Sequence, residues 1–176
     1  MAPGEPVAFR VRPARQEDAA AIARVHVATW DSAYRGLIAD AVIERFDLAT
    51  RTSRWEGALR ESLAATHVAE LRDEVVAFVS EGPARDDDLD ARTGEVWALY
   101  ADRSVWGTGV GRALVEYAFD RLRERGAERC VVWVLEENRR ARDFYERVGF
   151  VPDGTTREGP AGVAGPLRDL RLARPL

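Results

Sequence analysis

Lysine is absent from this sequence, and all 26 of its positively charged side chains are arginine. A P-loop nucleotide site needs a lysine beside the phosphates, and enzymes that form a Schiff base need a lysine amine. Both classes are therefore excluded. We attribute the arginine bias itself to GC-rich coding.

Cysteine and long apolar runs are also scarce. The single cysteine, Cys130, excludes an intrachain disulfide and favours a reducing compartment, so we expect a cytoplasmic protein. No apolar run approaches the length of a membrane span, and residues 1–6 lack the basic and apolar regions of a secretory signal. We expect residues 1–5 to be a flexible tail. The net charge of −4 gives no electrostatic reason to expect a nucleic-acid partner.

What is present describes an ordinary globular chain: 176 residues, of which 46% are hydrophobic and 32% charged. That length fits one domain over residues 1–176, and no repeat or linker divides it. Periodicity and turn residues predict alternating elements. The predicted strands are residues 7–11, 67–71, 75–79, 95–100, 130–135, 150–151 and 167–172; the predicted helices are 15–30, 39–46, 50–63, 111–125 and 139–148. This order indicates a mixed α/β sheet. Residues 155–165 are predicted to form a glycine-rich loop.

Residues 95–119 form the most informative stretch, in which a strand leads through a glycine-rich turn into a helix. The turn reads Trp106-Gly107-Thr108-Gly109-Val110-Gly111. Glycines allow backbone N–H groups to approach an anion, and the following helix N-terminus carries a partial positive charge. The stretch therefore predicts a phosphate-binding turn. A dinucleotide fold is disfavoured because Arg112 stands where that motif needs its third glycine.

A second motif follows the buried strand at 130–135. Asn138, the only asparagine, is placed to cap a helix whose inward stripe is Ala141, Phe144, Tyr145 and Val148. Together with the segment Leu99-Tyr100-Ala101 and the glycine turn, residues 138–150 resemble the acetyl-CoA-binding core of the GNAT N-acetyltransferases. The resemblance covers most of residues 95–150 and depends on two motifs in the right order.

The resemblance implies a fold, a cosubstrate and a reaction. The fold is α/β, with a mixed, mostly antiparallel central sheet splayed between its fourth and fifth strands and flanked by helices. The reaction is acetyl transfer from acetyl-CoA to an amine, without a metal, and a homodimer is an expected assembly. The implied cofactor-binding residues are Leu99, Tyr100, Ala101, Trp106, Gly107, Thr108, Gly109, Val110, Gly111, Arg112, Asn138, Ala141, Phe144 and Tyr145.

Two positions depart from the family pattern. The family usually has glutamine or arginine where this chain has Trp106, and Ala101 is smaller than the valine often found there. The backbone donors of the turn do not depend on either side chain. We therefore expect phosphate binding to survive, with Trp106 packing the turn or covering the adenosine.

Acetyl transfer from a thioester needs a neutral amine, donors for the oxyanion and a proton for the leaving thiolate. Tyr145 is the candidate general acid for the thiolate; the alternative is a core aromatic on the helix stripe. Glu95 is the candidate base, acting through a water and sharing a strand face with Trp97 and Leu99; the alternative is an exposed strand-end carboxylate. We expect the oxyanion donor to be a backbone N–H near Leu99 or Tyr100.

Other reactive residue types are expected to be structural. His26 lies on an apolar helix face, His67 lies in a strand, and Cys130 is expected to be a buried, inert thiol. No Cys/His cluster suggests a metal. Residues 85–90 form an acidic segment without the glycine and terminal glutamate of a calcium loop, so we expect a solvated loop.

The acceptor is expected to lie beside the first helices, where Trp30, Asp31 and Tyr34 could hold a cationic amine by cation–π contact and charge. Arg112 and one of the arginines at the start of the 139–148 helix are candidates for contact with a CoA phosphate, although a solvated arginine face is an alternative. The predicted function is acetylation of a primary amine of a small molecule by direct attack in a ternary complex. Acetylation of protein or peptide N-termini, and a non-catalytic acetyl-CoA-binding module, are the alternatives.

Overall fold

The computed structural model describes residues 8–61, 64–163 and 165–176. The predicted tail at residues 1–5, the start of the predicted strand 7–11 and residues 62–63 of the predicted third helix lie outside them. The strands are β1 (Arg10–Pro13), β2 (Ala65–Leu71), β3 (Glu74–Pro83), β4 (Thr93–Ala101), β5 (Arg129–Leu135), β6 (Val151–Ala161) and β7 (Pro166–Pro175). The α-helices are α1 (Ala19–Tyr34), α2 (Asp40–Glu44), α3 (Leu48–Glu61), α4 (Val110–Glu124) and α5 (Arg139–Arg147), and the short 3-10 turns are η1 (Gln16–Asp18) and η2 (Arg103–Val105).

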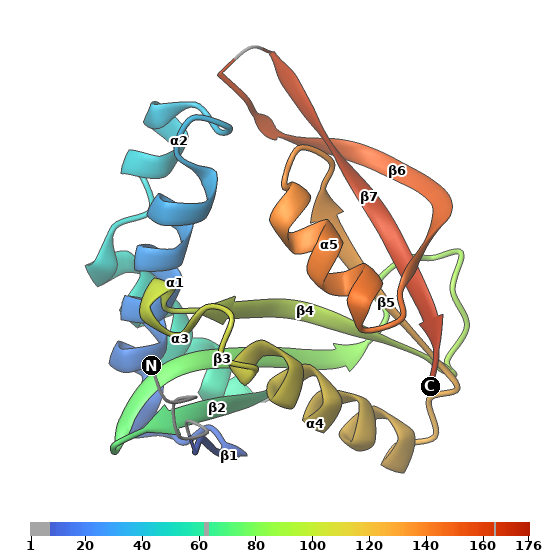
Figure 1. Cartoon of the computed structure of the whole chain (residues 1–176), viewed down its shortest axis with the longest axis horizontal. Coiled ribbons are helices and arrows are strands. Elements are labelled where there is room, and N and C mark those ends of the chain that lie inside the picture. Colours follow the sequence, from blue (N-terminus) through green and yellow to red (C-terminus); the bar gives the residue numbers. More distant parts are fainter. Residues whose placement is uncertain (1–7, 62–63, 164) are drawn as a thin grey trace, which may run out of the picture.

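The described strands form one sheet in the order β1-β2-β3-β4-β5-β7-β6 (Figure 1). Every neighbouring pair is antiparallel except β4 and β5, which are parallel and joined by the crossover helix α4. The mixed α/β sheet predicted from the element order and the mostly antiparallel pairing implied by the resemblance are therefore confirmed.

Helices cover both faces of the sheet because its strands present apolar side chains on both sides. The stripe of Leu114, Val115, Ala118 and Phe119 on α4 packs on one face, in a core that also includes Val148 and other residues around α5. Helices α1 and α3 pack on the opposite face against Val68, Val75 and Phe78. Strand β5 lies between β4 and β7, and most of its residues are buried, as its continuous apolar run predicts.

The sheet splays between β4 and β5, which is also as predicted. These strands pair over only four residues, from Thr93 opposite Arg129 to Val96 opposite Val132, and β4 continues to Ala101 without a partner on β5. A β-bulge interrupts the β3–β4 register where Ser80 faces Ala98 and Glu81 faces Val96. Bulges increase strand twist and bend the strand. The bulged strand therefore diverges from β5 beyond Val96.

The prediction of a glycine-rich loop at residues 155–165 is wrong for most of its length. Residues 155–161 belong to β6, which pairs with β7 through two register irregularities. A Cβ on Gly159 would lie 3.2 Å from the Leu167 backbone, so this glycine allows close strand pairing. Glycines that permit tight pairing and bulges resemble loop glycines when only the sequence is read.

No helix within the described ranges is both long and apolar enough to cross a membrane.

Candidate active site

A cavity of about 950 Å³ opens where β4 and β5 diverge. It reaches the first turns of α4 and α5 and the last turns of α1. Except for Thr108, the predicted cofactor-binding residues all contribute to its walls: Leu99, Tyr100, Ala101, Trp106, Gly107, Gly109, Val110, Gly111, Arg112, Asn138, Ala141, Phe144 and Tyr145. The Thr108 hydroxyl instead donates to the Val105 carbonyl at 2.6 Å, within the turn itself.

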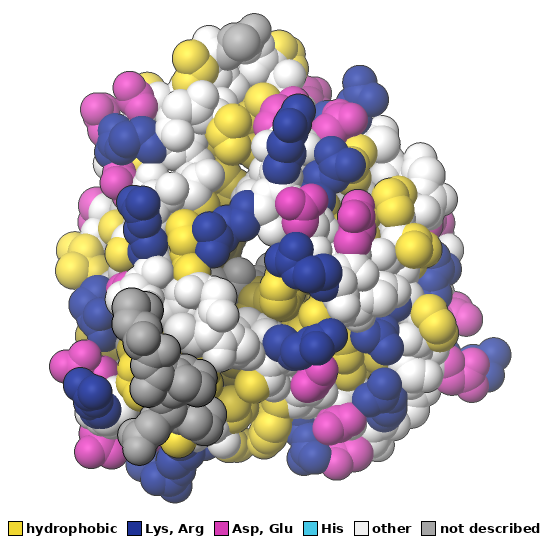
Figure 2. All heavy atoms as spheres, in the orientation of Figure 1, with side chains coloured by type: hydrophobic (Ala, Val, Ile, Leu, Met, Phe, Trp, Pro, Cys, Tyr) yellow, Lys and Arg dark blue, Asp and Glu magenta, His cyan; other side chains and the backbone are white. Residues whose placement is uncertain are grey.

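The cavity has two walls of different chemistry. We call residues 105–112 and 138–148 the glycine-turn wall, since they surround the turn before α4. We call the side formed by Thr29, Tyr34, Trp97, Tyr100 and Trp133 the aromatic wall. Figure 2 shows this face of the molecule, with arginine side chains around its hollow and hydrophobic side chains exposed within it.

The turn before α4 requires glycine at two positions for its backbone conformation. Gly107 has φ of 79° and Gly109 has φ of 94°, and a Cβ at either position would meet no atom within 4 Å. Glycine is therefore needed for the dihedral angle, and the space beside it stays open to a ligand. Since α4 begins at Val110, the free N–H groups of its first turn adjoin the same space. This arrangement can accept a phosphate, as the motif predicts.

Gly111 has a different role. A Cβ there would lie 3.3 Å from the Phe144 ring, so the missing side chain allows α5 to pack closely against the start of α4. Asn138 caps α5 as predicted, because its Oδ1 accepts from the Ala141 N–H at 3.1 Å. The two predicted motifs are thus brought together on one wall.

The free edge of β4 presents backbone groups to the cavity. The Asp102 N–H donates to the Val76 carbonyl on β3 at 2.8 Å. Because backbone directions alternate along a strand, the N–H and C=O groups of Leu99 and Ala101 point away from β3, toward β5. The Ala101 carbonyl already accepts from the Thr29 hydroxyl at 3.1 Å and from Trp106 Nε1 at 2.7 Å. Leu99 is therefore better placed than Tyr100 to offer a backbone N–H.

Three tyrosines and Asn138 converge between the walls. Burial raises the pKa of Tyr145 above its ordinary value, and nearby Tyr100 and Cys130 add to the shift. Burial also raises the pKa values of Tyr34 and Tyr100, and Tyr34 is within hydrogen-bonding reach of both Tyr100 and Asn138. All three hydroxyls therefore keep their protons at neutral pH and serve as donors.

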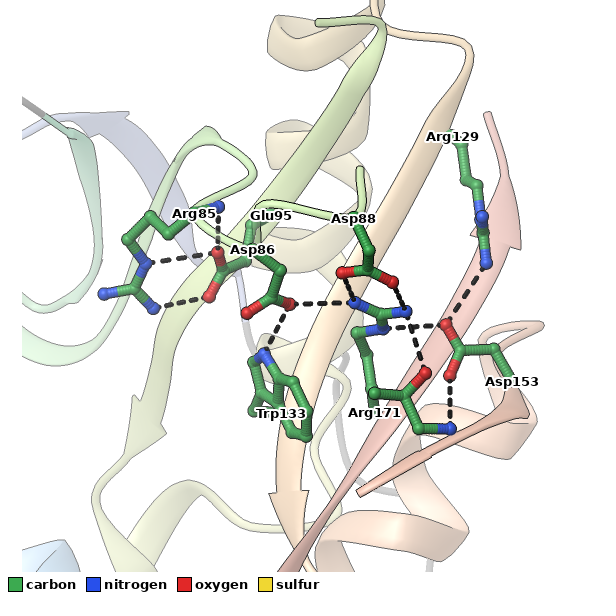
Figure 3. A network of polar contacts seen from close by, with 9 residues as sticks. Arg85, Asp86, Asp88, Glu95, Arg129, Trp133, Asp153 and Arg171 are labelled. Carbon is green, nitrogen blue, oxygen red and sulfur yellow. Dashed lines mark hydrogen bonds and ion pairs between the residues drawn. The ribbon is translucent and has the colours of Figure 1, made fainter. Parts of the chain in front are cut away.

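The structure corrects the expected position of Glu95. Its side chain is 1% exposed, and its Oε2 accepts from the Arg85 backbone N–H and Nε, each at 3.1 Å (Figure 3). The bulge puts Val96 and Leu99 together in the α4-side core, so Glu95 does not share a face with Leu99. It does lie beside Trp97, since Arg85 stacks on that ring at 4.4 Å. Glu95 is not among the residues that line the cavity.

Only one of the three predicted acceptor-binding residues reaches the cavity. Tyr34 lines it, whereas Trp30 lies behind the wall, stacked on Phe46 at 4.1 Å and donating from Nε1 to the Tyr100 hydroxyl at 3.1 Å. Asp31 is exposed and paired with Arg35 one turn along the helix. Helical periodicity gives the direction of a side chain but does not distinguish the cavity wall from the residues behind it.

Sequence reasoning missed the tryptophans Trp97 and Trp133 as cavity residues. Each lies in a strand where aromatic residues are common, so nothing in its local sequence marks it. Two contacts fix the Trp133 ring: its Nε1 donates to Asp86 at 3.0 Å, and the Arg157 guanidinium stacks over the ring at 4.2 Å.

The acidic segment expected to be a solvated loop is instead anchored by Arg171 of β7, whose side chain is 4% exposed (Figure 3). Arg171 pairs with Asp88 at 2.6 Å, with Asp153 at 2.8 Å and with Asp86 at 3.1 Å. We call these four residues the Arg171 network. It fixes the β3–β4 loop against β6 and β7, and Asp86 connects it to Trp133.

The residues expected to be structural are packed as predicted. His26 lies among aromatic rings and accepts from Trp55 Nε1 at 3.1 Å; burial lowers its pKa to about 3, so it is neutral. Cys130 is fully buried, and burial raises the pKa of its thiol to about 12. A thiol in that state is a poor nucleophile.

The family model described as the acetyltransferase (GNAT) family matches residues 30–150. That range covers both motifs and more than half of the sequence, and the chain therefore belongs to the GNAT N-acetyltransferase family.

Curated relatives agree with this assignment. The uncharacterized N-acetyltransferase YuaI of Bacillus subtilis is 31% identical over 73% of this chain and 72% of its own length. The peptidyl-lysine N-acetyltransferase YjaB of Escherichia coli is 33% identical over 64% of this chain and 80% of its own. The mycothiol acetyltransferase of Beutenbergia cavernae is 49% identical, but the match covers 36% of this chain and only 21% of that protein's length.

Solved structures share the fold. The PaiA N-acetyltransferase of Thermoplasma acidophilum, solved with coenzyme A, superposes with a TM-score of 0.75 over 96% of this chain and 99% of its own, at 17% identity. The putative acetyltransferase YncA of Salmonella typhimurium, solved with acetyl-CoA, gives 0.72 over 96% and 94%, at 20% identity.

Proposed function

We propose that this chain transfers the acetyl group of acetyl-CoA to a primary amine of a small molecule, by direct attack within a ternary complex. The observation that carries the proposal is the cavity at the β4–β5 splay. It joins a glycine turn suited to phosphates, a free strand edge and a buried tyrosine hydroxyl. A long cosubstrate with phosphates at one end and a thioester at the other fits such a site.

The residues present fit acetyl-CoA as the cosubstrate. The turn from Gly107 to Gly111 would bind the pyrophosphate through backbone N–H groups, and the edge of β4 at Leu99 would pair with the amide-containing pantetheine arm. The thioester would then lie near Tyr145 and Asn138, between the two walls. The CoA and acetyl-CoA held by two structural neighbours support this choice.

The proposed reaction forms a C–N bond and breaks the thioester C–S bond. A neutral amine attacks the thioester carbonyl, and the Leu99 N–H stabilises the oxyanion. The Tyr145 hydroxyl gives its proton to the thiolate as the C–S bond breaks, and the tyrosinate, whose pKa is raised by burial, takes a proton back from solvent. The thiol product stays protonated at neutral pH, since its ordinary pKa is roughly 8.5. The amine loses a proton as the C–N bond forms, and solvent in the cavity mouth accepts it. This route replaces Glu95, since Arg85 occupies that carboxylate.

A contact just beyond Tyr34, the last residue of α1, limits the size of the acceptor. The segment after α1 meets the β6–β7 hairpin there: Ile38 bridges Gly162, and the Val163 N–H donates to the Leu37 carbonyl at 3.0 Å. We expect the acceptor to bind beside Tyr34, and this contact closes one side of that space. A closed side favours a compact amine over an extended protein segment. The printed names of two relatives, a mycothiol acetyltransferase and a peptidyl-lysine N-acetyltransferase, indicate that acceptors vary among related chains.

Two measurements test the proposal. Saturating acetyl-CoA should raise the melting temperature by several degrees, and no shift at excess ligand would refute the cosubstrate assignment. A panel of small amines and short peptides, read by thiol release, should then show turnover with at least one small amine. Turnover with peptide N-termini alone would support the alternative acceptor. Binding without any turnover would support a non-catalytic module. A cytoplasmic location and a homodimer stay predictions, to be checked by fractionation and light scattering.

A further inference from the structure

Trp106 is fixed beside the glycine turn. Its Nε1 donates to the Ala101 carbonyl at 2.7 Å, which orients the ring at the edge of the cavity. A tryptophan has no charge of its own to offer a phosphate. The Trp106 ring can therefore contribute to phosphate binding only by positioning a charged neighbour.

Arg140, the second residue of α5, lies on the face of that ring. Its guanidinium carbon is 3.6 Å from the centroid of Trp106, well within the distance of a cation–π contact. Arg140 also lines the cavity. Among the described residues, no ion pair or hydrogen bond of its side chain to a carboxylate is found, so its charge is available to a ligand.

Other arginines surround the same corner. Partial burial and the positive charges of Arg103 and Arg147 lower the pKa of Arg140. Arg112 and Arg147 line the cavity together with Arg140. The Nε of Arg112 also forms an ion pair with Oε1 of Glu116 at 3.4 Å. Like charges held this close repel one another, and an anion between them would relieve the repulsion. The dark blue side chains around the hollow in Figure 2 show this concentration of arginine.

We propose that Arg140, held in place by the Trp106 ring, is a phosphate-binding residue for the CoA moiety. The proposal rests on the proposed function, because it assumes that acetyl-CoA occupies the cavity. The stack fixes a long, flexible side chain before the ligand arrives, and this reduces the entropy lost on binding. The phosphate is either the pyrophosphate at the glycine turn or the 3′-phosphate of the ribose, and the test separates these sources.

The test compares dissociation constants by calorimetry for Arg140→Gln and its matched control Arg139→Gln. Arg139 precedes it on α5 and is exposed, but does not line the cavity. Arg140→Gln should weaken acetyl-CoA binding about tenfold, in line with the loss of one charged hydrogen bond. Arg139→Gln should change it less than twofold. Binding of S-acetylpantetheine, which has no phosphate, should be the same in both variants.

Acetyl-3′-dephospho-CoA identifies the phosphate. If the effect of Arg140→Gln persists with this ligand, Arg140 binds the pyrophosphate; if it disappears, Arg140 binds the 3′-phosphate. Either result supports the proposal. Equal effects of Arg140→Gln and Arg139→Gln would overturn it, as would equal weakening of S-acetylpantetheine.

The role of the ring is tested in the same way. Trp106→Phe keeps an aromatic face, whereas Trp106→Leu removes it. Trp106→Leu should weaken acetyl-CoA binding several-fold, and should add nothing further when Arg140→Gln is already present. Trp106→Phe keeps the aromatic face but loses the Nε1 hydrogen bond to the Ala101 carbonyl, so it should bind acetyl-CoA more tightly than Trp106→Leu does. A normal melting curve for Trp106→Phe keeps the comparison valid if Trp106→Leu is unstable. A wild-type chain that does not bind acetyl-CoA at all would refute the proposed function instead.

Discussion

The glycine-turn wall comes from two short segments of the chain, whereas the aromatic wall is assembled from α1, β4 and β5. The first wall offers mainly backbone N–H groups, a helix N-terminus and arginine side chains. The second offers the ring faces of Tyr34, Tyr100 and Trp133 and the hydroxyls of the two tyrosines. A ligand that every relative shares can be bound by backbone geometry, while a ligand that differs among relatives is bound by replaceable side chains. The two walls are therefore expected to respond to mutation in different ways.

Tyr145 belongs to the glycine-turn wall and lies near Tyr100 of the aromatic wall, and its replacement should have the largest effect. Tyr145→Phe keeps the ring packed against Phe144 and Phe150 but removes the proton donor. We expect kcat to fall about 100-fold, in the range of general acid catalysis, with little change in KM for acetyl-CoA. Steady-state kinetics on an accepted amine would measure it.

Tyr117→Phe is the control for Tyr145→Phe. Tyr117 lies on α4 against His67, away from the cavity, so the same loss of a hydroxyl should leave kcat unchanged. An unaltered rate for Tyr145→Phe would remove this residue from the mechanism.

The glycine-turn wall should be broken by changing its backbone. Gly109→Ala places a Cβ at φ of 94°, which costs roughly 1–2 kcal/mol in a residue that is not glycine. We expect acetyl-CoA affinity to fall about tenfold and KM for the amine to stay close to the wild-type value.

Gly57→Ala provides the matched control for Gly109→Ala. Gly57 lies within α3, where a Cβ meets nothing within 4 Å and φ is not positive, so alanine should stabilise the helix by about 1 kcal/mol. Its acetyl-CoA affinity should not change. Identical binding by both variants would show that the turn does not depend on its left-handed glycine.

The aromatic wall should be sensitive to a single oxygen atom. Tyr34→Phe removes the hydroxyl that reaches Tyr100 and Asn138. We expect KM for the amine to rise three- to tenfold, corresponding to about 1 kcal/mol, with KM for acetyl-CoA unchanged. An increase in KM for acetyl-CoA alone would assign Tyr34 to the other wall.

The Arg171 network behind the aromatic wall should give the smallest effect, a contribution to stability that is lost in acid. Burial opposes ionisation of Asp153, but hydrogen bonds from Thr155 and Arg171 lower its pKa overall; a hydrogen bond from Arg171 likewise lowers the pKa of Asp88. The folded-state pKa values are thus below the unfolded value of about 3.9. Their stabilising contribution is present above about pH 4 and is lost as the pH falls through the folded-state values.

Urea unfolding at pH 7, 5 and 3 would measure this dependence. The wild type should be more stable than Asp153→Asn at pH 7 and 5, and the difference should shrink at pH 3. A difference that stays constant across this range would show that the carboxylate of Asp153 contributes no charge-dependent stability.

The glycine-turn wall could be predicted because its information is local. The positive φ values of Gly107 and Gly109, the cap by Asn138 and the start of α4 each depend on residues a few positions apart. The aromatic wall could be predicted only in part: Tyr34 and Tyr100 are expected in the site, but Trp97 and Trp133 meet the cavity only through the splay of their strands. The prediction for the position of Glu95 is wrong for a similar reason. A β-bulge opposite Ser80 and Glu81 changes which side chains of β4 share a face, and this bulge arises from pairing with β3, which is distant in the sequence.

The strand order implies that the sheet can be completed only after the last strand, β7, has been synthesised. β7 follows β6 in the chain but lies between β5 and β6, and it pairs with both. As the chain leaves the ribosome, β1 to β4 and α4 can form first, while β5 keeps an unpaired, largely apolar edge until residues 166–175 emerge. Arg171, which holds the β3–β4 loop, arrives in that same last segment. A nascent chain should therefore receive the support behind its aromatic wall last, and stalled chains lacking β7 should be the ones that chaperones bind.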